Sequence, residues 1–90
     1  MIKKIILDSL TEINHELKNK ALNSISDNTQ IFDNLDSVAV LDLIIEIESR
    51  LQLEYGEFIQ VADDTVMDEI HTPFKTLSSL IGFVEKKVNT

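Results

Sequence analysis

Residues 36–53 read DSVAVLDLIIEIESRLQL, and the apolar residues in this stretch recur at helical spacing. At 100° per residue, one arc collects five apolar side chains, which are Val40, Leu43, Ile44, Ile47 and Leu51. Asp36 precedes the first turn, where a carboxylate can accept hydrogen bonds from unpaired backbone N–H groups. Gly56 follows the last turn and suits the left-handed position that often ends a helix. The sequence therefore predicts a helix over 37–53 with one face in the core.

Two further helices are expected on either side of this stretch. Before it, a helix over 3–22 is predicted from apolar residues spaced three or four apart, at Ile2, Ile6, Leu10, Ile13, Leu17 and Ala21. After it, Thr76 can cap a helix that runs to about Lys87, with Leu77, Leu80, Ile81, Val84 and Val88 as its apolar positions.

The connecting segments complete the expected fold. Residues 23–34 are rich in Ser, Asp, Asn and Thr, which favour turns, so they predict a long loop that Ile31 and Phe32 pin to the core. Residues 63–70 fit a short helix of one or two turns. The chain is thus predicted to be a single all-α domain over 1–90, a small four-helix bundle with three main helices, one short helix and a long loop between helices one and two.

Composition narrows the classes of function. The chain has 16 acidic and 8 basic side chains and a formal net charge of −8, which disfavours binding to nucleic-acid phosphates. It contains no cysteine, which excludes disulfides, thiolate nucleophiles and cysteine-ligated zinc. No apolar run approaches the roughly 20 residues that cross a bilayer, and the first ten residues are unlike a secretory signal. We expect a cytoplasmic protein that does not insert into membranes.

Charge and a second apolar stripe mark the 37–53 helix. Ten acidic residues and one basic residue lie within 36–72. On the same helix, Val38, Leu41 and Ile45 fall about 100–160° around from Val40, near acidic side chains at Asp42, Glu46 and Glu48. Two interpretations are open. Neighbouring helices cover this stripe, as is most common, or it forms an exposed docking face for a basic partner.

The start of this helix resembles the phosphopantetheine attachment site of acyl and peptidyl carrier proteins. The matching segments are FDNLDSV at 32–38, LDLI at 41–44 and EIE at 46–48. In that family an Asp-Ser-Leu tripeptide opens the second helix of a four-helix bundle, and here the tripeptide is Asp-Ser-Val. The resemblance extends over the whole chain, including FKTL at 74–77 at the start of the last helix.

The resemblance implies a carrier and not an enzyme. Ser37 would bear 4′-phosphopantetheine covalently, and Asp36 would position the helix start. The implied partner-binding residues are Val38, Leu41, Asp42, Ile45, Glu46 and Glu48. The implied partners are a phosphopantetheinyl transferase and acyl-loading ligase or synthase enzymes with basic docking surfaces. We expect a monomer.

The cargo and one rival function stay open. Asn34, Val38 and Ala39 depart from the residues usual at their positions in the family, and fatty-acid, polyketide, aminoacyl and D-alanyl carriers share this frame. The rival is an unmodified acidic helical adaptor or inhibitor that binds a basic protein through the same face.

Other motifs predict no catalytic or metal site. Glu12 and His15 form one Glu-x-x-His, but a di-iron bundle needs two such motifs and further carboxylates. No histidine neighbours Ser37 in sequence, so Ser37 does not resemble a hydrolase nucleophile. The acidic residues of 63–69 are expected to be a solvated turn.

Overall fold

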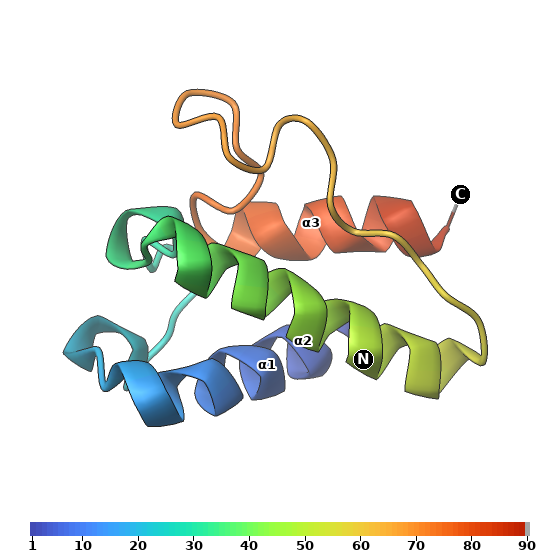
Figure 1. Cartoon of the computed structure of the whole chain (residues 1–90), viewed down its shortest axis with the longest axis horizontal. Coiled ribbons are helices and arrows are strands. Elements are labelled where there is room, and N and C mark those ends of the chain that lie inside the picture. The colour runs from blue at the N-terminus through green and yellow to red at the C-terminus, as the bar shows by residue number, and fades with distance from the viewer. Residues whose placement is uncertain (90) are drawn as a thin grey trace.

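Three α-helices form the framework of residues 1–89, the part of the chain that this computed structural model describes (Figure 1). They are α1 (Ile2–Leu17), α2 (Ser37–Tyr55) and α3 (Leu77–Val88). Two short 3₁₀ turns, η1 (Lys20–Leu22) and η2 (Phe32–Asn34), interrupt the connection between α1 and α2. The predicted all-α class is confirmed, since the described residues contain three helices and no strand beyond a single bridge between Gln30 and Thr76.

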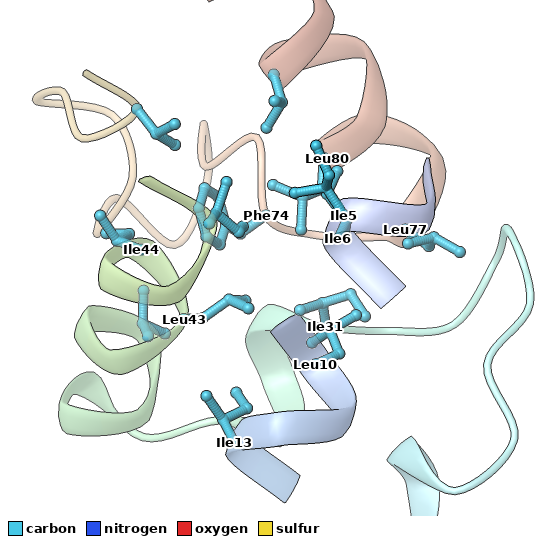
Figure 2. Packing of buried hydrophobic residues seen from close by; sticks show 14 of the residues in the cluster. Ile5, Ile6, Leu10, Ile13, Ile31, Leu43, Ile44, Phe74, Leu77 and Leu80 are labelled. Carbon is cyan, nitrogen blue, oxygen red and sulfur yellow. The ribbon is translucent and has the colours of Figure 1, made fainter. Parts of the chain in front are cut away.

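Helix α1 holds the fold together because it packs against both α2 and α3. It runs antiparallel to each of them (Figure 1). Apolar side chains from all three helices meet in one buried cluster with residues of the connecting segments (Figure 2). The five residues predicted for the core arc of α2 are all buried, and they are Val40, Leu43, Ile44, Ile47 and Leu51.

The first helix ends earlier than predicted. The sequence indicated a helix over 3–22, but α1 stops at Leu17, and Lys18 adopts a left-handed backbone with φ 53°. After Leu17, asparagine side chains take the place of the backbone hydrogen bonds of a helix. The Asn14 Oδ1 accepts a hydrogen bond from the Asn19 N–H at 2.8 Å, and the Asn19 side chain caps η1. As a result Ala21 is exposed and does not extend the buried face.

The long loop between α1 and α2 is tied to the segment before α3. The Ile31 N–H donates to the Lys75 carbonyl at 2.8 Å, and the Phe32 N–H donates to the Phe74 carbonyl at 2.9 Å. Ile31 is fully buried, and Phe32 packs against the core, so both anchor as predicted. These contacts therefore fix the position of the loop just before α2 begins.

Residues 63–70 form turns, and the short helix expected there is not present. The Thr65 N–H donates to the Asp63 carboxylate, and the Ile70 N–H donates to the Asp68 carboxylate, both at 2.9 Å. Each aspartate thus closes its own turn, because its side chain competes for N–H groups that a continuous helix would use. Val66 between them is buried and fastens the segment to the core. The four-helix detail of the predicted bundle is not confirmed.

Asp63 links this turn segment to α3 and makes stability depend on pH. The hydrogen bond from Thr65 holds the pKa of the Asp63 carboxyl below its ordinary value, and the Lys87 ammonium, 3.3 Å away, acts in the same direction. A lowered folded-state pKa contributes stability that is present above the unfolded value of about 3.9 and is lost as the pH falls through the folded value.

We expect the wild type to be more stable than Asp63→Asn near neutral pH, with the difference shrinking in acid. Urea denaturation of both proteins at about pH 6 and about pH 3 measures this. If the difference in stability between the wild type and Asp63→Asn were the same at both pH values, the ionised carboxylate of Asp63 would not be what stabilises the fold.

Candidate functional site

The start of α2 presents Ser37 to solvent. Asp36 is the N-cap as predicted, and its Oδ1 accepts a hydrogen bond from the Ala39 N–H at 2.8 Å. Ser37 is the first residue of the helix and is exposed. Because the N-terminus of a helix carries partial positive charge, a phosphate ester on the Ser37 hydroxyl would lie in a favourable field. The corner is thus accessible and compatible with an anionic group.

The second Asp-Ser pair of the chain occupies a different environment. Ser9 lies in the middle of α1, is fully buried, and its hydroxyl donates to the Ile5 carbonyl at 2.8 Å. Its neighbour Asp8 pairs with Lys4 at 2.9 Å. A modifying enzyme cannot reach a buried and hydrogen-bonded hydroxyl, so position in the fold separates two sites that look alike in sequence.

The apolar stripe on α2 is uncovered. The exposed fraction is 65% for Val38, 52% for Leu41 and 60% for Ile45. The interpretation that neighbouring helices bury this stripe is therefore wrong. Three large apolar side chains in solvent on one helix are typical of a contact surface.

We expect alanine substitution of this stripe to leave stability nearly unchanged. Leu41→Ala and Ile45→Ala should each cost below about 1 kcal/mol, because exposed side chains lose little packing. Leu43→Ala is the matched control on the same helix: Leu43 is fully buried, and its truncation should cost about 2–5 kcal/mol. Chemical denaturation measures all three. A large loss for Ile45→Ala would place that side chain in the core.

The predicted acidic residues of α2 point to two sides of the helix. Asp42 and Glu46 flank the side that faces α1, and Glu46 pairs with Arg50 at 3.5 Å. Glu48 lies on the side that faces the segment after α2. The six predicted partner-binding residues thus spread over much of the exposed surface of α2 and do not form one compact spot.

Glu48 has a structural partner within the chain. Its Oε2 accepts hydrogen bonds from the N–H groups of Val61 and Ala62, at 2.8 and 3.3 Å. Val61 is fully buried, so the carboxylate fixes the point where the segment after α2 enters the core. The sequence assigned Glu48 to partner binding alone, and the 13-residue separation from Val61 gave no signal of this contact.

We expect Glu48→Ala to cost about 1–3 kcal/mol, because it leaves a part-buried N–H without its acceptor. Asp42→Ala is the control, since Asp42 is exposed and its loss should change stability by no more than about 0.5 kcal/mol. Glu48→Gln keeps an acceptor oxygen and should fall between the two. Urea denaturation measures the stability of each variant. Equal stabilities of Glu48→Ala and Asp42→Ala would show that the Glu48 contact does not stabilise the fold.

A groove between α1 and α2 adds residues that the sequence did not assign to a site. It measures about 290 Å³ and is lined by Glu12, Ile13, Glu16, Leu17, Ala39, Asp42, Ile45 and Glu46. The spacing of Glu12 and Glu16 places them one turn apart on α1. The sequence alone did not indicate that Glu12 and Glu16 lie opposite Asp42 and Glu46, because this arrangement depends on how α1 and α2 pack.

The two histidines pair locally with acids. His15 lies 3.7 Å from Glu12, and His71 lies 2.9 Å from Asp68, with all four side chains exposed. The hydrogen bond with His71 keeps the pKa of the Asp68 carboxyl below its ordinary value. Within residues 1–89, no group of three or more His, Cys, Asp or Glu side chains is arranged to hold a metal ion.

Comparisons with known proteins found no relative of this chain. No family model, no curated protein and no solved structure matches the chain. Among the helices of residues 1–89, none has the length and apolar character needed to cross a membrane.

Proposed function

We propose that this protein is an acyl carrier in which Ser37 bears a 4′-phosphopantetheine arm. The observation that supports this most is the exposed Ser37 hydroxyl at the first position of α2, directly after the capping Asp36 and at the start of an acidic helix. The FDNLDSV segment at 32–38 resembles the attachment site of carrier proteins.

The residues around Ser37 fit such a group. When bound, the arm would supply the thiol that this cysteine-free chain lacks, and an acyl or aminoacyl group could be held on it as a thioester. The Ser37 hydroxyl oxygen would form a phosphodiester with the pantetheine phosphate of coenzyme A, while the pyrophosphate bond of coenzyme A breaks and adenosine 3′,5′-bisphosphate leaves. Asp36 holds the helix start in place through its bond to Ala39, so the hydroxyl keeps a constant position for the modifying enzyme.

Nothing beside Ser37 in sequence activates its hydroxyl, which agrees with a carrier and not a catalyst. A serine nucleophile in a hydrolase needs an adjacent base, and the residues before and after Ser37 are Asp36, which caps the helix, and Val38. The proton of the Ser37 hydroxyl would therefore be removed by a group on a phosphopantetheinyl transferase.

The exposed stripe would serve partner docking. Val38, Leu41 and Ile45 present apolar surface beside Ser37, while Asp42 and Glu46 add negative charge that attracts basic surfaces. Partners would be the transferase and the ligase or synthase enzymes that load the arm. In carrier proteins a short helix precedes the last one, and the turns of residues 63–70 would take its place here. We expect the carrier to act as a monomer in the cytoplasm.

Intact-mass measurement tests the proposal. The full chain is incubated with coenzyme A and a promiscuous phosphopantetheinyl transferase, and one added phosphopantetheine group is expected. A known carrier protein in the same reaction shows that the transferase is active. If that control is modified and this chain is not, the carrier proposal fails, and the rival function as an unmodified acidic adaptor is favoured.

A further inference from the structure

The acidic residues of α2 in the groove between α1 and α2 point away from Ser37. At 100° per residue, Asp42 and Glu46 lie about 140° and about 180° around the helix from Ser37, while Ile45 at the edge of the groove lies about 80° from it. Glu12 and Glu16 of α1 form the opposite wall of the same groove. A partner seated in this groove would therefore leave Ser37 accessible.

The groove combines an apolar lining with four carboxylates. Ile13 and Ala39 are buried at its base, while Leu17 and Ile45 are 40% and 60% exposed at its edges. Glu12, Glu16, Asp42 and Glu46 surround these apolar groups. Two large apolar side chains left in solvent inside an acidic rim suit a ligand that is apolar on one face and positively charged around it.

The shape of the surface indicates an elongated ligand. A second hollow lies farther along the same two helices and is lined by Met1, Lys4, Ile5, Asp8, Arg50, Leu53 and Glu54. From Ala39 to Leu53 the two hollows extend over 14 residue steps of α2, or about 21 Å at 1.5 Å per residue. An α-helix of about 14 residues has this length.

The two hollows differ in charge, and this difference would orient a bound helix. The second hollow is lined by two basic residues, Lys4 and Arg50, and by two acidic residues, Asp8 and Glu54, so its charges balance. Arg50 also lies 3.5 Å from Glu46 of the first hollow. The first hollow has four carboxylates in its lining and no basic residue. A ligand helix would thus place its basic end over the C-terminal end of α1 and the N-terminal end of α2.

We infer that the α1–α2 groove docks an amphipathic helix of a partner protein, with large apolar residues on its inner face and Lys or Arg clustered at one end. This inference deepens the partner docking of the proposed function, because Asp42, Ile45 and Glu46 belong to both surfaces. It does not depend on the attachment of an arm at Ser37. The groove recognises the partner by charge at its acidic end and by apolar contact at Leu17 and Ile45.

The test uses the unmodified full chain and a synthetic helix as probe. The probe is a fluorescent peptide of about 18 residues built from Leu, Ala and Lys, with Leu on one face and Lys clustered toward one end. Two control peptides carry Glu in place of Lys, or the same composition in scrambled order. Fluorescence anisotropy gives the Kd at about 0.1 M salt, and amide chemical shifts of the ¹⁵N-labelled chain locate the peptide.

We expect the probe to shift amides of residues 12–17 and 39–46 and to bind better than both control peptides. The double variant Glu12→Lys/Glu16→Lys should weaken binding by about tenfold or more, since it reverses two charges of the rim. Glu57→Lys/Glu69→Lys changes the net charge equally at exposed positions outside both hollows, and it should change the Kd less than about twofold. Ile45→Ala should weaken binding several-fold.

Three results would overturn the inference. One is the absence of binding. Another is equal weakening by the two double variants, which would show a response to net charge alone. The third is sedimentation of the free chain as a dimer that the probe dissociates, which would make a second copy the occupant. Because the unmodified chain is used, failure here leaves the proposal for Ser37 standing, and failure to modify Ser37 leaves this result unaffected.

Discussion

Ser37→Ala is expected to abolish attachment of phosphopantetheine completely while the fold stays intact. The Ser37 hydroxyl would be the atom that accepts the group, so no slower reaction at the same position can replace it. Stability should change by no more than about 0.5 kcal/mol, because the side chain is exposed and alanine is a good helix former. Intact mass and far-UV circular dichroism measure the two effects on the same sample.

The matched control for this prediction is Ser49→Ala. Ser49 is an exposed serine on the same helix, and its variant should accept one group as the wild type does. Ser9 is fully buried and should stay unmodified in every variant. Modification of the Ser37→Ala protein at any serine would refute the assignment of the site, and loss of helicity would give Ser37 a structural role instead.

Local patterns predicted the framework of this protein well. The apolar arc of α2, its Asp36 cap and the left-handed Gly56 at its end were all readable, because each depends on residues within one or two turns. Thr76 caps α3 as predicted, and Lys86 and Lys87 lie in its last turn. The end of a helix is harder to predict where side chains replace its backbone hydrogen bonds. The side chains of Asn14 and Asn19 do so after α1.

The candidate site was predicted in part. Ser37 and its cap follow from the sequence, and the structure adds that the serine is exposed. Whether Ile45 is covered could not be read from periodicity, since the same spacing occurs in buried and exposed stripes. The contact of Glu48 with Val61 and the position of Glu12 in the groove depend on tertiary packing between segments distant in sequence.

Phe74→Ala should destabilise the fold far more than substitution of an exposed apolar residue. Phe74 is fully buried, and its ring meets the ring of Phe83 edge-on with centroids 6.3 Å apart. Removing a buried phenylalanine leaves a cavity and costs about 3–5 kcal/mol. Phe58→Ala is the matched control, because Phe58 is 61% exposed and its loss should cost below about 1 kcal/mol. Urea denaturation followed by circular dichroism compares the two.

The same substitution is expected to loosen the loop that leads to Ser37. The Phe32 N–H donates to the Phe74 carbonyl, and the Ile31 N–H donates to the Lys75 carbonyl, so a shift of this segment weakens both bonds. Hydrogen exchange at Ile31 and Phe32 should therefore accelerate in Phe74→Ala and stay as in the wild type in Phe58→Ala. If exchange at these two amides were unchanged while global stability fell, Phe74 would stabilise the core without holding the approach to α2.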